Sequence, residues 1–356
     1  MKPAALLLFA LLFPFLTHSA ELPRPFAMGA DLSLMKFIED HGVKYRENGV
    51  AKDPLAIFKE HGCNYVRLRL FVNPDGTGGQ VNTLPYTVAM AKRVKSAGLR
   101  FLLDLHYSDK WADPGHQSVP EAWKNLTEPE LIDRTRLYTK EVLTTFKNEA
   151  CLPDMVQIGN EITNGLMWPA GGPITDAKWE TFGNLLKAGI KGVRDVDPEN
   201  HIQIMIHTDR GGDKGVSGWF FKKLTSQSVP FDVIGLTYYP FWSGGLENLS
   251  STLADLSKTY QKDIVVVETG NNWSGDPKAS PYPQTPEGQK AFLEGVIHTV
   301  AATPGGHGKG VFYWSPDWTQ SKEWDAGPGA GQWEDRALFD RTGNMLPAME
   351  AFLTKP

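Results

Sequence analysis

Short runs of hydrophobic residues recur along the chain and are separated by longer segments that mix apolar and charged positions. The runs are rich in Val, Ile, Leu and aromatic residues, as buried β-strands are, and they cover residues 26–31, 65–71, 100–106, 155–160, 201–207, 231–238, 264–268 and 310–314. The segments between them have helical spacing, notably over residues 53–61, 86–97, 128–146, 178–196, 246–260 and 286–300. The pattern predicts eight strands that alternate with helices.

Local signals mark the ends of these elements. Asp53 and Thr285 each precede a Pro at a first helical position, and Gly62 and Gly98 end helices directly before strands. Alternating strands and helices form parallel sheets, and eight such units fit a barrel better than an open doubly wound sheet. The length of 356 residues would also allow two domains, but no linker divides the chain. We predict the α/β class, with a single (β/α)8 TIM barrel over residues 21–356.

Residues 1–20 have the layout of a secretory signal peptide. Lys2 is positive, residues 6–16 are almost uninterrupted Leu, Phe and Ala, and Ser19 and Ala20 are small. A transmembrane anchor is the alternative, but the apolar run is shorter than the roughly 20 residues that span a bilayer, and a proline interrupts it. We predict a secreted protein, extracellular or periplasmic, without membrane contact after cleavage.

Charge and composition narrow the classes of partner. The chain has 36 basic and 41 acidic residues and no block of like charge, so we expect no nucleic-acid partner. Its two cysteines, Cys63 and Cys151, cannot form a disulfide scaffold, and we interpret them as buried free thiols. Flat aromatic faces near the surface suit sugar rings. Several tryptophans lie in predicted loops, where each is as consistent with packing as with sugar binding: Trp111, Trp168, Trp242, Trp273 and Trp318.

Polar side chains lie at the ends of several predicted strands, where barrel enzymes hold their active sites. They are Arg67, Arg69, Asp104, His106, Asn160, Glu161, His207, Asp209, Tyr238, Glu268 and Trp314. Glu161 and Glu268 are each the first carboxylate after a strand long enough to cross the barrel. Two carboxylates that converge on one cleft are what hydrolysis of a glycosidic bond requires, because one protonates the leaving oxygen while the other attacks the anomeric carbon or activates water.

A purely structural role for the two glutamates is the alternative. Arg67 and Arg69 carry positive charge into the barrel, and buried charges need partners. The two interpretations are compatible, because an arginine beside one glutamate keeps that group ionised while the other stays protonated. We expect Arg67 to pair with Glu268 and lower its pKa, and Glu161 to lack so close a cation and keep a raised pKa.

Eight motifs, in order along the chain, resemble family 53 of the glycoside hydrolases, the endo-β-1,4-galactanases, which belong to the retaining enzymes of clan A. The resemblance runs from about residue 29 to the C-terminus. The motifs are GAD (29–31), VRLRLFVNP (66–74), DLHYSDKWADP (104–114), IGNEI with GLMWP (158–162 and 165–169), IMIHTD (204–209), YYPF (238–241), VVVET (265–269) and FYW (312–314). Each motif is weak alone, but eight in order are specific.

The resemblance implies hydrolysis of β-1,4-galactan, as in type I arabinogalactan and pectin side chains, with retention through a covalent glycosyl-enzyme intermediate. It implies that Glu161 is the acid/base, Glu268 the nucleophile and Asn160 a hydrogen-bond donor to the sugar 2-hydroxyl. The same resemblance places around the sugar at the cleavage point Arg67, His106, Asp209 and Tyr238, with Trp314 as the aromatic floor. Another clan A endo-glycanase, of the mannanase or cellulase type, and a non-catalytic sugar-binding barrel are the alternatives.

We predict no required cofactor and no catalytic metal. His106, Asp109 and His116 are candidate ligands, but metal sites need three or four groups at set spacing, and sugar binding explains the same segment. Bacterial relatives can carry a structural calcium after the seventh strand; here Asp276 is the only carboxylate in residues 270–284, which disfavours an oxygen cage. We expect a monomer whose partner is the polysaccharide.

Overall fold

The computed structural model of the protein describes residues 25–275, 280–324, 331 and 333–356. Within these residues, eight parallel strands close into a barrel in the order β1-β10-β9-β8-β7-β6-β5-β4. Their bounds are β1 Ala27–Asp31, β4 Tyr65–Leu70, β5 Arg100–Leu105, β6 Met155–Ile158, β7 Gln203–Thr208, β8 Val233–Tyr238, β9 Asp263–Thr269 and β10 Gly308–Trp314. The predicted (β/α)8 barrel is confirmed; the predicted signal peptide lies outside the described residues.

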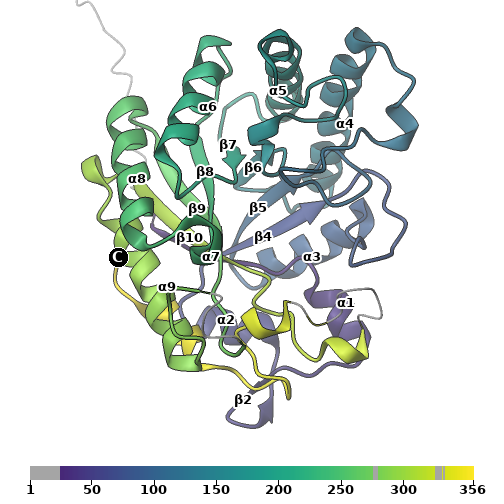
Figure 1. The fold of residues 1–356 in the computed structure, drawn as a ribbon. Helices are drawn as coiled ribbons and strands as arrows, with labels where there is room; N and C mark the ends of the chain where they lie inside the picture. The colour runs from purple at the N-terminus through teal and green to yellow at the C-terminus, as the bar shows by residue number, and fades with distance from the viewer. Residues whose placement is uncertain (1–24, 276–279, 325–330, 332) are drawn as a thin grey trace, which may run out of the picture.

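Helices follow the strands and surround the barrel (Figure 1). They are α1 Met35–Asp40, α2 Pro54–Glu60, α3 Leu84–Ser96, α4 Glu128–Asn148, α5 Trp179–Arg194, α6 Lys214–Ser226, α7 Pro240–Ser243, α8 Leu246–Tyr260 and α9 Pro286–Ala301. Asp53 caps α2 by accepting a hydrogen bond from the Ala56 amide, and Thr285 caps α9 by accepting one from Gly288. The predicted helix starts are therefore confirmed, because each capping side chain satisfies an amide that the first turn leaves free.

Some elements were not predicted. Helix α6 begins after Asp213, whose side chain accepts from the Val216 amide, but Gly215 and Gly218 in its first turns weaken its helical signal. A short hairpin of β2 (Arg46–Glu47) and β3 (Val50–Ala51) also lies outside the barrel. Single turns of 3-10 helix are η1 Glu121–Trp123, η2 Ile162–Asn164, η3 Asp176–Lys178, η4 Pro304–Gly306, η5 Ser321–Glu323 and η6 Glu334–Arg336, with a longer η7 Pro347–Leu353.

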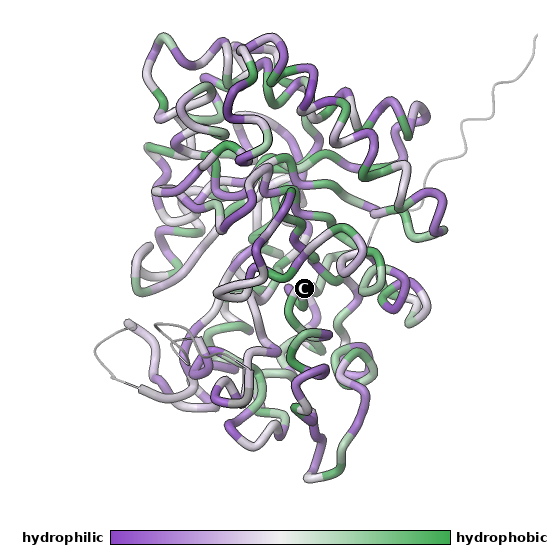
Figure 2. The backbone as a smooth tube through the Cα atoms, turned by 90° about the vertical axis from the view of Figure 1, so that its right-hand side faces the viewer, coloured by the Kyte–Doolittle hydropathy of each residue, from purple (hydrophilic) through white to green (hydrophobic). Residues whose placement is uncertain are grey.

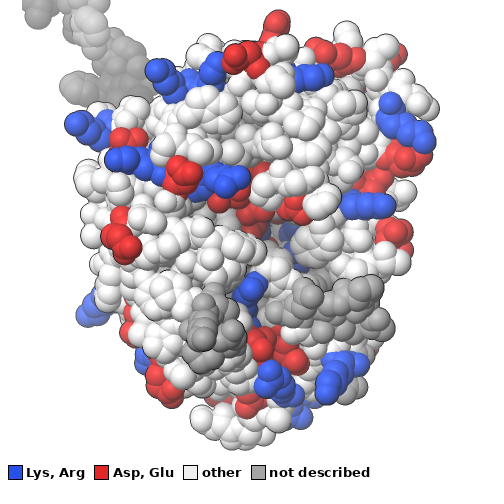
Figure 3. All heavy atoms as spheres, viewed as in Figure 1, with Lys and Arg blue, Asp and Glu red and all other residues white. Residues whose placement is uncertain are grey.

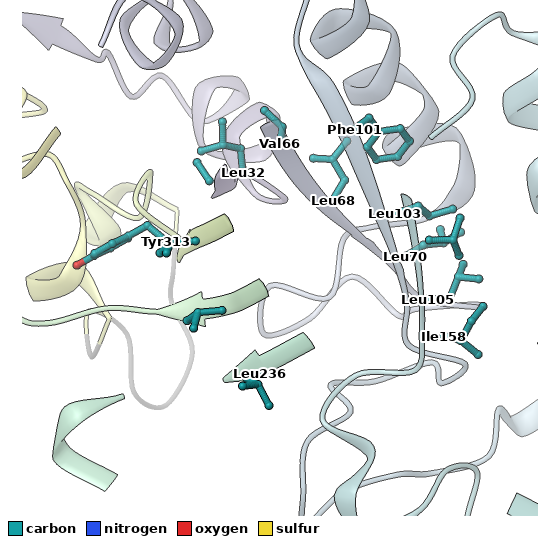
Figure 4. Packing of buried hydrophobic residues seen from close by; sticks show 14 of the residues in the cluster. Leu32, Val66, Leu68, Leu70, Phe101, Leu103, Leu105, Ile158, Leu236 and Tyr313 are labelled. Atoms are coloured by element: carbon teal, nitrogen blue, oxygen red, sulfur yellow. The ribbon is translucent and has the colours of Figure 1, made fainter. Parts of the chain in front are cut away.

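Side chains along the strands alternate between the barrel interior and the surrounding helices, as the two-residue period of a strand requires. Val66, Leu68 and Leu70 of β4 belong to the cluster between strands and helices and lie beside Phe101, Leu103 and Leu105 of β5 (Figure 4). A smaller cluster fills the inside of the barrel with Ala27, Tyr65, Leu102, Met155, Met205, Val233, Val265, Val267 and Phe312. The apolar interior ends where polar residues of the same inward parity begin, and these build the site.

Hydrophilic and hydrophobic residues alternate along much of the backbone, and hydrophobic segments run through the middle of the molecule (Figure 2). Cys63 and Cys151 are both free and buried, as predicted, and burial raises the pKa of the Cys63 thiol to about 12. Among the described residues, no helix has both the length and the apolar character needed to cross a membrane.

Candidate active site

A cleft of about 1360 Å³ opens at the carboxyl ends of the barrel strands. It is lined by most of the predicted site residues: Arg67, His106, Asn160, Glu161, Asp209, Glu268 and Trp314. Acidic and basic side chains gather in a depression near the middle of the molecule in Figure 3. The structure thus brings seven of the eight predicted site residues together in one cleft, and Tyr238 is the exception.

Glu268 reaches the barrel interior because β9 carries a bulge. Leu236 of β8 pairs with Val266, but the next residue, Thr237, pairs with Glu268, so Val267 has no counterpart. Val267 lies in the apolar cluster inside the barrel, and strict alternation would turn its neighbour Glu268 toward the helices. A bulge adds one residue and re-aims the side chain that follows. Both Val267 and Glu268 consequently face inward.

Arg67 contacts three carboxylates in the site. Its guanidinium lies 2.8 Å from Glu268 Oε1, 2.8 Å from Asp31 Oδ2 and 2.9 Å from Asp104 Oδ2, and all four side chains are almost fully buried. It also donates to Asn160 Oδ1 at 2.8 Å. The predicted pairing of Arg67 with Glu268 is confirmed. Because three carboxylates share one cation, the attraction available to each is divided.

Glu161 has a different set of neighbours. It lies just after β6, with a left-handed backbone conformation (φ 49°), and it is less buried than Glu268. The Thr237 hydroxyl donates to Glu161 Oε1 at 2.7 Å. Within the described residues, Glu161 has no ion pair with a basic side chain, which agrees with the prediction for this group.

The pKa of each glutamate is raised. Burial raises the pKa of Glu161 well above its usual range, and the nearby Glu268 charge adds to this effect. Burial also raises the pKa of Glu268 to about 7, against the opposing attraction of Arg67. The expectation that Arg67 would lower the pKa of Glu268 is thus wrong for the net shift, since burial and the charges of Asp104 and Asp31 outweigh it. When the pair carries a single proton, Arg67 still favours the charge on Glu268.

His106, Asn160 and Asp209 lie around this carboxylate pair. His106 Nε2 lies 3.0 Å from Asp104 Oδ2, while its Nδ1 accepts from the Ala112 amide at 3.2 Å. Asn160 Nδ2 donates to the Ala112 carbonyl at 2.8 Å, which leaves one N–H of the amide for a substrate. Asp209 pairs with Arg210 at 2.9 Å, and burial raises its pKa. These three predicted side chains come together in the cleft.

Tyr238 does not belong to the cleft, which corrects the prediction. Its outward parity on β8 places it in the cluster between strands and helices, where its ring stacks on Phe292 and its hydroxyl donates to the Gly244 carbonyl. The next residue, Tyr239, lines the cleft instead. Inward positions on β8 follow every second residue from Val233 to Thr237. Continuing this count one step past the strand would have selected Tyr239.

Trp314 stands in a group of aromatic side chains on one side of the cleft. Its ring centroid lies 4.6 Å from that of Trp333, 5.7 Å from Trp318 and 6.4 Å from Trp111. The Arg69 guanidinium lies 4.2 Å from the centre of the Trp111 ring. Among the other loop tryptophans, Trp242 also lines the cleft, whereas Trp168 and Trp273 do not line it. Trp324 and Trp333 also line it; sequence analysis did not single them out, because their long loop lacks regular spacing.

The candidate metal ligands do not converge. Asp109 accepts hydrogen bonds from the amides of Asn73 and Glu121, and the exposed His116 pairs with Asp113. In the described part of the chain, no group of three or more His, Cys, Asp or Glu side chains is arranged to hold a metal ion. Asp276, on which the calcium argument rests, lies outside the described residues.

The fold and the site together define a class of enzyme. Two carboxylates, one paired with an arginine and one hydrogen-bonded to a threonine hydroxyl, line an aromatic cleft at the mouth of a (β/α)8 barrel. Barrel enzymes carry their chemistry at this end of the strands. A pair of carboxylates in an open cleft is the usual catalytic arrangement of glycoside hydrolases.

Comparison with known proteins shows which family of glycoside hydrolases the chain resembles. The model of "Glycosyl hydrolase family 53" matches residues 27–352. A probable arabinogalactan endo-β-1,4-galactanase A of Neosartorya fischeri is 39% identical over 325 residues, which cover 87% of this chain and 89% of the relative. The family 53 catalytic domain of Ignisphaera aggregans superposes with a TM-score of 0.87 at 36% identity, covering 94% of this chain and 97% of that one. A fungal β-1,4-galactanase structure gives a TM-score of 0.81 at 34% identity, covering 92% and 99%.

The chain therefore belongs to glycosyl hydrolase family 53, and it is a glycoside hydrolase.

Proposed function

We propose that the protein is a secreted endo-β-1,4-galactanase that hydrolyses β-1,4-galactan with retention of configuration. The observation that carries this proposal is the asymmetry of the two carboxylates in one cleft, with Arg67 on Glu268 at 2.8 Å and the Thr237 hydroxyl on Glu161 at 2.7 Å. The names of the relatives support galactan as the substrate. Type I arabinogalactan and the galactan side chains of pectin contain this linkage.

In the proposed first step, Glu161 donates its proton to the glycosidic oxygen while the bond from that oxygen to the anomeric carbon breaks. A Glu268 carboxylate oxygen forms a bond to the same carbon from the opposite face, giving a glycosyl-enzyme. Glu161, now a carboxylate, then takes a proton from water, whose oxygen attacks the anomeric carbon and releases Glu268. Two inversions give retention.

We propose that cleavage is of the endo type. The cleft is lined by aromatic side chains from several loops, among them Trp242, Trp314 and Trp333. Trp242 is 71% exposed, so its face is available to a sugar ring. A chain that extends past the carboxylates in both directions can be cut internally, and short oligosaccharides should precede galactose.

A substrate comparison tests this function. Release of reducing ends from β-1,4-galactan, with a rapid fall in viscosity, is expected, together with no release from mannan or carboxymethylcellulose. Cleavage of mannan or cellulose instead would favour another clan A endo-glycanase. Tight binding of galactan without any hydrolysis would indicate a non-catalytic sugar-binding barrel. Galactose as the sole early product would refute the endo mode.

Export and oligomeric state belong to the same proposal. The hydrophobic N-terminal segment supports secretion, and we expect a monomer that requires no cofactor. Expression of the full chain followed by N-terminal sequencing of the exported protein should show cleavage near Ala20, and light scattering should give the mass of one chain. Retention of activity after dialysis against a chelator would support the absence of a required metal.

A further inference from the structure

A ring of hydrogen bonds joins the backbone of Glu161 to its own side chain through two neighbouring strands. The Glu161 amide donates to Nδ1 of His207, on β7, at 3.3 Å. His207 Nε2 lies 2.8 Å from Oγ1 of Thr237, on β8. The Thr237 hydroxyl lies 2.7 Å from Glu161 Oε1. His207 is fully buried and Thr237 is 4% exposed, so bulk water does not compete for these contacts.

The donors in this ring can be assigned from chemistry. A backbone N–H can only donate, so Nδ1 of His207 is an acceptor and its single proton lies on Nε2. Gln157 also directs its Nε2 at the same Nδ1, at 3.1 Å. The Asn160 amide oxygen lies 3.0 Å from Nδ1, but it already accepts from Arg67 and Gln157. Burial and the Arg67 charge lower the pKa of His207 well below its usual range, which agrees with one proton on the ring.

The orientation of the Thr237 hydroxyl follows from that tautomer. Its oxygen accepts from His207 Nε2, so its only proton is free to donate to Glu161 Oε1. We infer that Thr237, oriented by His207, is a positioning residue that holds Glu161 Oε1 as an acceptor and leaves the transferable proton on Oε2. This inference rests on the proposed function of Glu161 as the catalytic acid.

The position of the proton matters for the first step of the reaction. A carboxylic acid that carries its proton on the oxygen bound by Thr237 would have to rotate before it could reach the leaving oxygen. The groups that face Glu161 from other elements are Glu268 on β9, Asp209 after β7, Arg67 on β4 and Tyr239 after β8. Thr237 differs from these groups because it is uncharged and donates a hydrogen bond directly to one carboxyl oxygen of Glu161.

A pair of threonine variants isolates this bond. Thr237→Val keeps the shape of the side chain and removes the hydroxyl. Thr208→Val is the matched control, because Thr208 is a fully buried threonine on β7 whose hydroxyl has no hydrogen-bond partner in the described residues and whose strand parity points away from the cleft. Thr237→Ser restores a hydroxyl at the same place. Each is assayed with aryl β-galactosides that have good and poor leaving groups.

We expect Thr237→Val to reduce kcat/KM about 10- to 100-fold for the poor leaving group, since general acid catalysis contributes about 100- to 10,000-fold in all. A good leaving group needs no proton, so its kcat/KM, which reports formation of the glycosyl-enzyme, should fall by less than about threefold. Loss of a donor to the carboxylate raises its pKa, and the alkaline limb of the kcat profile should therefore move to higher pH. Thr237→Ser should recover the leaving-group dependence and the limb, and Thr208→Val should change neither.

Equal losses for both leaving groups, with an unmoved alkaline limb, would show that Thr237 only maintains the structure and would overturn the inference. ¹⁵N spectra of labelled wild-type protein give an independent test, because they report which ring nitrogen of His207 is protonated. A proton on Nδ1 would contradict the inference, whereas a proton on Nε2 supports it. Neither the spectra nor the leaving-group series uses galactan, so a failure of galactan hydrolysis would refute the proposed substrate separately.

Discussion

The two glutamates of the cleft occupy contrasting surroundings. Glu268 sits on the charged side, where Arg67 joins it to Asp31 and Asp104. Glu161 has a neutral hydrogen-bond partner, the Thr237 hydroxyl. Burial raises the pKa of both groups, but within the described residues only Glu268 of the two has a cation in contact with it. The neighbours of these two identical side chains thus favour different roles. The Arg67 charge beside Glu268 favours an ionised nucleophile, and the lack of such a contact at Glu161 favours a protonated acid.

The largest effect is expected from Glu268→Ala. Without the carboxylate, no covalent intermediate forms, and galactan hydrolysis should fall by about 10,000-fold or more. Added azide should enter the space left by the side chain and restore part of the activity toward an aryl glycoside, with an inverted product. A variant that keeps near-normal turnover of galactan would remove Glu268 from the catalytic pair.

Glu161→Ala should have a large effect that depends on the substrate. Loss of the acid should slow galactan hydrolysis by about 100- to 10,000-fold, while an activated aryl glycoside is still converted to the glycosyl-enzyme. Steady-state and burst kinetics with the two substrates measure this difference. Equal losses for both would mean that Glu161 does not protonate the leaving group, and the contrast between the two glutamates would fail.

Arg67→Met should destabilise the fold as well as reduce activity. Three buried carboxylates lose their shared cation, and removal of one partner of a buried ion pair costs about 3–5 kcal/mol. Urea unfolding at pH 7 measures the loss. Lys92→Met is the control, since Lys92 pairs with Glu149 on the surface and such exposed pairs contribute little to stability. Similar losses for the two variants would show that the ion pairs of Arg67 contribute no more to the free energy of unfolding than a surface ion pair does.

The smallest effect concerns Glu268→Gln and pH. The pKa of Glu268 is raised to about 7 in the folded protein. At low pH the group is protonated in both the folded and the unfolded state, so burying it does not reduce stability through ionisation. As pH rises through about 7 the buried group must ionise, and this destabilises the folded protein. Glutamine removes this effect. The stability of the variant relative to the wild type should increase by about 1–3 kcal/mol between pH 5 and pH 8. Thermal unfolding at both pH values tests this, and a constant or falling difference would contradict it.

Sequence analysis captured the barrel because apolar runs, helix caps and glycine stops all act over a few residues. It also captured the ion pair of Arg67 with Glu268, because charge inside a barrel must be balanced. It could not foresee the net pKa of Glu268, which depends on how far Asp31 and Asp104 share the same cation.

The residues that were missed depended on parity and on contacts between distant strands. Tyr238 and Tyr239 differ only in which side of β8 they face, and the polar run in the sequence does not reveal the side. The bulge that turns Glu268 inward is a pairing irregularity that the sequence of β9 does not display. Thr237 acts on Glu161 across 76 positions of the chain, through a contact that only the closed barrel creates.

Trapping of the covalent intermediate tests the division of roles most directly. A 2-deoxy-2-fluoro-β-galactoside with a good leaving group should inactivate the wild-type enzyme by leaving a slowly hydrolysed glycosyl ester, because fluorine disfavours the transition state that follows. Peptide mass spectrometry is predicted to place the label on Glu268, in the segment Asp263–Thr269, with Glu161 unmodified. A label on Glu161, with Glu268 unmodified, would reverse the roles that Arg67 and Thr237 assign and would contradict the account.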